Sequence, residues 1–227
     1  MLKLKGSGKY NKPVNIPRYL HKVNGRQVLH YNADPNGPEV SFKKNGFIKF
    51  MKSDFYVPMP PTLKKEDVKW VRVVPKGNHI IVELGYEVHL PSQITNENIA
   101  SIDLGVNNLA VLVSNTFEPV IINGKPLKSI NQYYNKEISR LKSLLPEKTY
   151  SSKKIKDLYS RRHFKFEDYL HKASRFIVNR LVSNNISTLV VGYNKEWKQD
   201  TNLGKRSYQN FVGIPFYRFL SMLKYKC

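Results

Sequence analysis

The segment Ile99–Val113 contains the side chain best suited to chemistry, Asp103, placed between apolar residues. Ile99–Val106 is predicted to be a buried strand that leads through a turn at Asn107-Asn108 into a second strand, Leu109–Val113. A carboxylate within a buried strand is costly unless it is neutralised, and a divalent cation is its usual partner. The alternative is that Asp103 caps the turn by accepting hydrogen bonds from nearby backbone amides.

A second distinctive segment is the polar stretch 193–210, which follows a predicted short buried strand at Ser187–Gly192. It interleaves cationic, aromatic and amide side chains and has no apolar periodicity. Such a loop suits contact with a sugar-phosphate backbone and with base faces. The alternative is an ordinary surface loop whose tryptophan folds back onto the core. The candidate contacts in this loop are Tyr193, Asn194, Lys195, Trp197, Lys198, Lys205 and Arg206.

The charge balance points to a polyanionic partner. The chain has 38 Lys and Arg against 17 Asp and Glu, a formal net charge of +21. Such an excess repels itself, and nucleic acid neutralises it best through phosphate contacts and counterion release. A membrane surface is the competing partner, but it would favour cations gathered in one amphipathic helix or tail, whereas here they are spread along the chain.

Composition also bears on location. No apolar run approaches the ~18 residues of a membrane span, and Met1–Gly8 turns polar at once. We therefore expect no membrane partner and a cytoplasmic, nucleoid-associated protein. The single cysteine, Cys227, excludes an internal disulfide and a cysteine-based zinc site within the chain.

Residues 1–95 are predicted to form the first domain, an RNA-binding one made of short strands separated by Gly- and Pro-containing turns. β-Branched and aromatic segments lie at 27–31, 47–50, 68–74 and 79–88, and the last two look like one hairpin. Closely spaced short strands predict a small antiparallel barrel. Its cations fit either a solvated surface or a platform for RNA backbone, with Arg72 and Lys76 as candidate contacts.

Residues 96–227 are predicted to form the second domain, after a polar link at 91–98. A third strand at Pro119–Ile122 follows the two strands around Asp103. Three consecutive strands with the carboxylate on the first are the opening of an RNase H-like sheet.

Helices complete this second domain. Apolar residues recur at helical spacing from Ile130 to Leu181, with an interruption at Pro146, and Asn184-Asn185 ends the pattern. A last helix begins at Pro215. The predicted fold class is therefore α+β or α/β, an antiparallel barrel followed by an RNase H-like domain.

Five separated motifs resemble, in the right order, the TnpB proteins of insertion sequences, the transposon-encoded ancestors of type V CRISPR effectors. They lie at 101–110, 169–175, 189–198, 202–206 and 210–216. Segments 16–20 and 71–78 also resemble the wedge region upstream of the RuvC nuclease domain in that family. The resemblance implies a guide RNA and a matching double-stranded DNA as partners. The candidate contacts on the helix are His171, Lys172 and Arg175.

The same resemblance shows departures from a nuclease. A RuvC site cuts with two divalent metals held by several carboxylates. Asp103 matches the first ligand, but Gly192 stands where many relatives carry a glutamate. Relatives with this glycine take their glutamate from a strand further downstream, and the chain ends before such a strand, the last aspartate and the zinc finger. Glu196 and Asp200 lie past the strand end, on the loop.

We therefore expect no enzyme activity and no catalytic residues, with Asp103 vestigial and the RuvC domain truncated. No metal cofactor is expected, and Mg²⁺ would be needed only if nuclease activity is retained. The prediction is a nuclease-dead TnpB derivative resembling the TldR repressors. Such a protein binds guide RNA and target DNA and blocks transcription, with pairing reading the sequence and the protein reading backbone shape.

Two alternatives stay open. The chain could be a fragment of an active TnpB RNA-guided DNA endonuclease, whose missing carboxylates lie on a second polypeptide or were lost by truncation. It could also be a decayed transposon fragment without stable function, which predicts exposed apolar surface where absent elements should pack.

Overall fold

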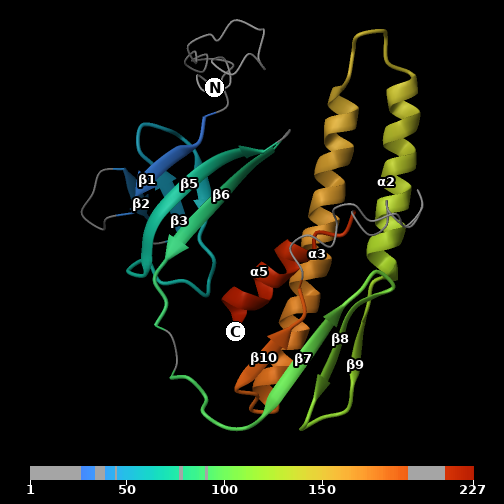
Figure 1. The fold of residues 1–227 in the computed structure, drawn as a ribbon. Coiled ribbons are helices and arrows are strands. Elements are labelled where there is room, and N and C mark those ends of the chain that lie inside the picture. Colours follow the sequence, from blue (N-terminus) through green and yellow to red (C-terminus); the bar gives the residue numbers. More distant parts are fainter. Residues whose placement is uncertain (1–26, 34–38, 44, 77–78, 90–91, 194–212) are drawn as a thin grey trace, which may run out of the picture. The chain divides into compact units, whose positions relative to one another are not determined.

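The computed structural model describes residues 27–33, 39–43, 45–76, 79–89, 92–193 and 213–227 (Figure 1). These residues belong to two compact units, which divide between Val88 and His89. The division falls slightly before the predicted boundary after residue 95. Among the described residues, the first unit contains strands without helices, and the second unit contains both strands and helices.

The first unit contains two three-stranded antiparallel sheets. One has the order β1-β5-β6, with β1 at Leu29–Asn32, β5 at Val68–Lys76 and β6 at His79–Tyr86. The other has the order β2-β3-β4, with β2 at Val40–Phe42, β3 at Phe47–Phe50 and β4 at Tyr56–Pro58. The predicted β5–β6 hairpin is confirmed by its antiparallel pairing.

The predicted closed barrel is wrong for the described residues. A barrel needs each strand to be hydrogen-bonded to two neighbours around a ring. Here each sheet ends at two edge strands, and no strand pairing joins one sheet to the other. The two sheets share a core instead, in which Ile48 and Phe50 of β3 are buried with Val68 and Val71 of β5.

The second unit is built on a mixed four-stranded sheet of order β10-β7-β8-β9 (Figure 1). The strands are β7 at Ile99–Leu104, β8 at Asn108–Ser114, β9 at Val120–Asn123 and β10 at Thr188–Val191. β10 runs parallel to β7, and the other two pairs are antiparallel. All four strands lie within two or three residues of where the sequence predicted them.

Three described helices complete the second unit: α2 at Lys125–Ser143, α3 at Lys153–Ser183 and α5 at Phe216–Lys226. The break between α2 and α3 contains Pro146, as predicted. The Ser152 hydroxyl caps α3 by accepting a hydrogen bond from the Ile155 amide at 3.3 Å. Beyond the end of α3, Asn185 takes a left-handed backbone with φ of 53°, which suits an asparagine that ends a helix.

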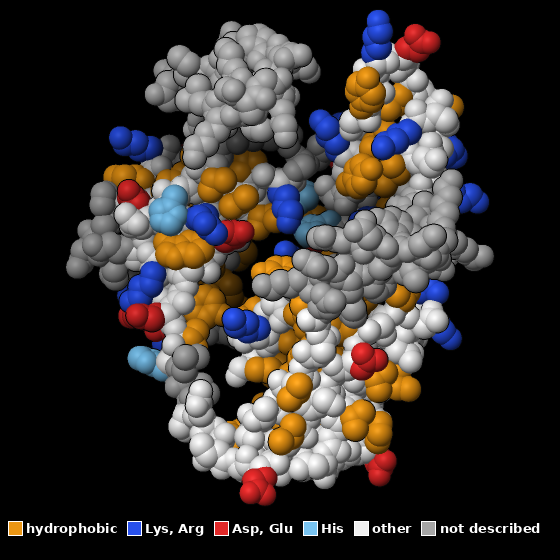
Figure 2. Space-filling view, viewed as in Figure 1, with side chains coloured by type: hydrophobic (Ala, Val, Ile, Leu, Met, Phe, Trp, Pro, Cys, Tyr) orange, Lys and Arg blue, Asp and Glu red, His pale blue; other side chains and the backbone are white. Residues whose placement is uncertain are grey.

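One face of the four-stranded sheet carries the core. Ile102 and Leu112 of the sheet are buried in one cluster with Leu170 and Ile177 of α3 and with Phe219 of α5. The other face is not covered by the described residues, and Figure 2 shows separate hydrophobic side chains among polar ones in the region of this sheet. The exposed apolar residues there include Val113, Ile121 and Val190.

This one-sided packing corrects two predictions. β7 alternates strictly, with Ala100, Ile102 and Leu104 buried and the residues between them exposed. β10 is likewise only half-buried. The predicted buried strands are therefore half-exposed, because helices cover a single face of the sheet. Within the described residues, no helix is long and apolar enough to cross a membrane.

Candidate nucleic-acid interface

Asp103 lies on the exposed face of β7. β10 runs beside it in parallel, with Val190 opposite Ser101 and Val191 opposite Ile102. The Gly192 amide continues this ladder by donating to the Ile102 carbonyl oxygen at 3.3 Å. The register therefore brings position 192 beside Asp103 on the same face.

Position 192 has room for a side chain. A Cβ built there meets one non-neighbouring atom within 4 Å among the described residues, the Ile102 carbonyl oxygen at 4.0 Å. Its backbone is also outside the left-handed region that would favour glycine. Nothing in the described structure therefore requires a glycine beside Asp103.

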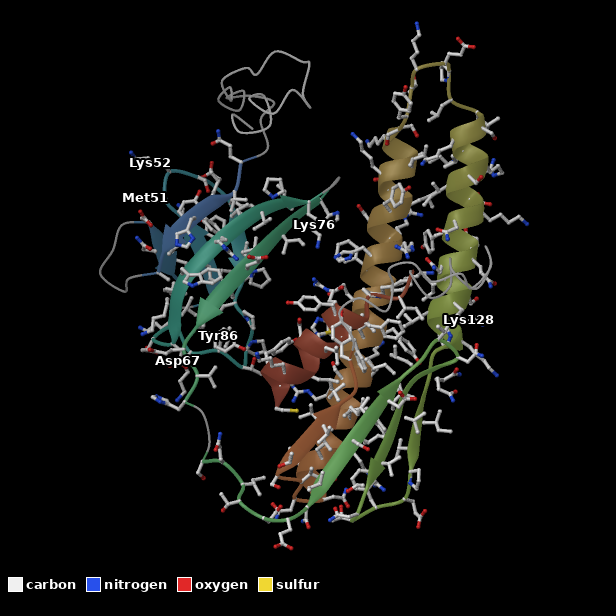
Figure 3. All side chains as sticks on the ribbon, in the orientation of Figure 1. Met51, Lys52, Asp67, Lys76, Tyr86 and Lys128 are labelled. Atoms are coloured by element: carbon white, nitrogen blue, oxygen red, sulfur yellow. The ribbon has the colours of Figure 1, made fainter. Side chains whose placement is uncertain are left out.

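The turn after β7 is held by groups other than Asp103. The Lys128 ammonium, at the start of α2, donates to the Asn107 side-chain oxygen at 2.7 Å, and the Gly124 amide donates to the Asn107 carbonyl at 2.7 Å (Figure 3). The Asp103 carboxylate makes no hydrogen bond or ion pair with the described residues. The alternative that it caps the turn therefore finds no support.

The donors around Asp103 do not make up a two-metal site within the described part of the chain. No group of three or more His, Cys, Asp or Glu side chains there could hold a metal ion. Glu196 and Asp200 lie outside the described residues. The absence of a metal cofactor stays a prediction.

Most of the predicted loop contacts also lie outside the described residues: Asn194, Lys195, Trp197, Lys198, Lys205 and Arg206. Tyr193 is described and is partly buried against the core of the second unit. It begins the loop from an anchored position rather than a fully exposed one.

The three predicted helix contacts come together in one groove. His171, Lys172 and Arg175 are exposed on α3 and line an open groove of about 620 Å³ with Tyr225 and Lys226 of α5. Asp168, Phe176 and Asn179 complete its lining. Tyr225 and Lys226 were not among the predicted contacts. An aromatic residue beside a cation near the end of a helix is nevertheless a pattern from which they could have been predicted.

Lys226 is fixed within this groove. Its ammonium donates to the Ser174 hydroxyl at 2.7 Å and to the His171 carbonyl oxygen at 3.1 Å. Burial, and then the nearby positive charge of Arg175, lower the pKa of Lys226 below its ordinary value. The groove therefore holds two like charges close together.

α5 is held against α3 by both apolar and ionic contacts. Phe216 and Phe219 are fully buried in the shared core. Arg218 of α5 forms an ion pair with Glu167 of α3, whose side chain is only 14% exposed. Glu167 also lies within 4.0 Å of His163 and of His171. The groove walls are thus positioned by the fold rather than by a ligand.

In the first unit, Arg72 is already engaged. It donates to the Glu83 carboxylate at 2.7 and 3.1 Å, and its guanidinium lies 4.6 Å from the centroid of the Trp70 ring. Lys76 lies at the end of β5, at the tip of the β5–β6 hairpin (Figure 3). Both residues stay predicted contacts.

The comparison with protein families gives the class to which the chain belongs. Residues 79–198, more than half of the chain, match the OrfB_IS605 family, described as a probable transposase. The chain belongs to this family. The relationship to TnpB proteins predicted from the motifs is thereby confirmed, while the resemblance to TldR repressors stays a prediction.

Two similar proteins illustrate the relationship. The TnpB-like protein MJ0751 of Methanocaldococcus jannaschii is 26% identical over 148 residues, which is 63% of this chain and 52% of the relative. The chain therefore spans about half the length of this curated relative. A chain from the cryo-EM structure of the Cas12f1-sgRNA-target DNA complex superposes with a TM-score of 0.54 at 14% identity, covering 71% of this chain and 34% of that one. This second likeness is one of fold.

Proposed function

We propose that this chain is an RNA-guided DNA-binding protein that occupies its target without cutting it and so represses transcription. The structurally similar Cas12f1 chain is in complex with an sgRNA and target DNA, and the chain's family is TnpB-like. Both relationships support RNA and DNA as the partners. The inactive form of the proposal is supported by the position beside Asp103, where Gly192 supplies no second carboxylate.

The charge of the chain supports binding of this kind. A net charge of +21 favours neutralisation of many phosphates, which gives affinity without base contacts. In RNA-guided recognition the guide reads the target by base pairing, while the protein holds the heteroduplex through its backbone and shape. A broadly cationic chain therefore suits the task better than a single base-reading helix.

The fold of the second unit is compatible with an RNase H-like domain that binds nucleic acid without hydrolysing it. β7, which carries Asp103, is parallel to β10 and antiparallel to β8. Two-metal hydrolysis needs further carboxylates close to that first one. At position 192, directly after β10, glycine supplies no ligand.

An active nuclease is the second candidate, and one finding favours it. Asp103 is exposed and free of hydrogen bonds within the described residues, so it is available to a metal if other ligands are supplied. The exposed apolar residues on the same sheet face suit the third alternative, a decayed fragment.

The proposal is tested by purifying the chain from its own cells and sequencing any RNA that travels with it. DNA that matches this RNA is then offered in a gel-shift assay at fixed salt. We expect a shift that needs both the RNA and the matching sequence. Absence of a co-purifying RNA, or equal binding to unmatched DNA, would contradict the proposal, and a specific RNA would argue against a decayed fragment.

A further inference from the structure

We propose that the groove between α3 and α5 binds a single-stranded nucleic-acid segment. A backbone phosphate lies between Arg175 and Lys226, and an unpaired base lies against Tyr225. This inference rests on the proposed function, that the chain binds nucleic acid, and adds the kind of strand and the residues that hold it.

The cationic pair calls for an anion. The Lys226 ammonium donates to the Ser174 hydroxyl and the His171 carbonyl oxygen, and it lies 3.5 Å from Nδ1 of His171. Neither Lys226 nor Arg175 has a carboxylate partner among the described residues. Neighbouring like charges disfavour one another unless an anion lies between them. A phosphodiester carries one negative charge and two free oxygens, which suit a guanidinium and an ammonium together.

Nearby acids are already neutralised by other cations. Asp168 pairs with Lys172 at 2.8 Å within α3. Glu167 pairs with Arg218, which crosses from α5. These two pairs leave Arg175 and Lys226 as the uncompensated charge of the groove, so an incoming phosphate meets attraction there.

Aromatic side chains make the site specific for a single strand. Tyr225 is 64% exposed on α5, and Phe176 is 51% exposed on α3, one on each wall of the groove. The Lys226 ammonium lies 5.8 Å from the centroid of the Tyr225 ring, so phosphate and base contacts are adjacent. Aromatic rings bind unpaired bases by stacking, whereas the base faces of a duplex are already covered.

The groove also has a suitable size and rigidity. The groove is open to solvent, and its volume of about 620 Å³ leaves room for a nucleotide. Its walls are fixed by the buried Phe216 and Phe219 of α5. A preformed site spends little binding energy on ordering itself.

Fluorescence anisotropy with a labelled oligothymidylate of about ten nucleotides tests the proposal, since such lengths fall within known single-strand site sizes. The test variant is Arg175→Gln with Lys226→Gln. The control, Lys142→Gln with Lys224→Gln, removes the same charge from exposed sites outside the groove. We expect the groove variant to bind the oligothymidylate about tenfold more weakly than the wild type, because it loses specific phosphate contacts. The control should lose about twofold in affinity, because it loses only general electrostatic attraction.

Stacking is tested separately with two substitutions of Tyr225. We expect Tyr225→Leu to weaken single-strand binding several-fold and Tyr225→Phe to leave it unchanged, because the phenylalanine keeps the ring. A duplex of the same length should be insensitive to both. Equal losses in the groove and control variants, or an inert Tyr225→Leu, would overturn the proposal, and thermal unfolding of each variant checks that it is folded.

The same proteins are offered the co-purifying RNA. If the wild-type chain binds that RNA while the groove variant holds the oligonucleotide as tightly as the wild type, the groove inference fails and the proposed function stands. If the wild-type chain binds neither, the proposed function fails too.

Discussion

Gly192, directly after the parallel strand β10, lies beside Asp103 on the same exposed face of the sheet. A second carboxylate is therefore absent at this position, although the backbone leaves room for one. A single substitution at position 192 tests whether a carboxylate there would act together with Asp103.

Gly192→Glu should create a weak divalent-cation site. Two adjacent carboxylates attract a metal ion more strongly than one, and the position accommodates a side chain without displacing the sheet. We expect Mn²⁺ to bind at least about tenfold more tightly than to the parent chain, an increment of about 1.4 kcal/mol. Isothermal titration calorimetry measures it.

The control for this gain is the double variant Gly192→Glu with Asp103→Asn, which keeps the new acid and removes the old one. It should return to the affinity of the parent chain. Unchanged affinity in the single variant would mean that the two positions do not act together.

Asp103→Asn alone should be almost silent. The carboxylate is exposed and has no hydrogen-bond partner among the described residues, so its loss should change the free energy of unfolding by less than about 0.5 kcal/mol. Urea unfolding and the gel-shift assay provide the two measurements. A large loss of RNA-dependent DNA binding would instead show that the Asp103 carboxylate contributes to that binding.

Arg218→Gln should destabilise the contact between α5 and α3. It leaves the Glu167 carboxylate, only 14% exposed, without its strongest partner, which we expect to cost about 1–3 kcal/mol in urea unfolding. The matched control is Arg140→Gln, whose ion pair with Glu137 lies on the surface of α2 and should be worth less than about 0.5 kcal/mol. Similar costs for both variants would show that Glu167 is solvated.

Single-strand binding should weaken at high pH because of Lys226. Burial and the charge of Arg175 lower the pKa of Lys226, so its ammonium loses a proton, and its attraction for phosphate, at a lower pH than an ordinary lysine with a pKa of 10.5. For stability the sign is the opposite. The folded chain releases this proton more readily than the unfolded chain, so the contribution of Lys226 to stability rises as pH approaches 10.5.

Titrating the oligonucleotide affinity against pH in a Tyr225→Phe background measures the effect, since that substitution removes the phenol hydroxyl from the groove. His171, Arg175, Asp168 and Lys172 also face the groove and are kept. Adding Lys226→Gln should remove the alkaline fall in affinity. The same profile with and without Lys226 would refute the assignment.

The sequence predicted local features well, because their causes are local. Pro146 separates the helices, Asn184 and Asn185 end α3, and apolar alternation with turn residues gives β5 to β10. The exposure of Asp103 was missed, because an apolar run does not reveal whether one or both faces of a sheet are covered. The barrel was wrong for a similar reason, since closure depends on pairing between distant strands as short as β2 and β4.

The candidate site shows the same limit. The cations of α3 were recognised from their motif, but Tyr225 and Lys226 join them only through the packing of Phe216 and Phe219 onto α3. Side chains that meet through tertiary packing leave no signature in a local pattern. The groove could therefore be recognised only in the structure, whereas the family could be predicted from the sequence.

The proposed function is tested most directly by a cleavage assay of the chain with its co-purified RNA, matching double-stranded DNA and Mg²⁺. We expect a stable, sequence-dependent complex in which both DNA strands stay intact on denaturing gels. Cutting of the matching DNA by this chain alone, abolished by Asp103→Asn, would contradict it and establish an active nuclease.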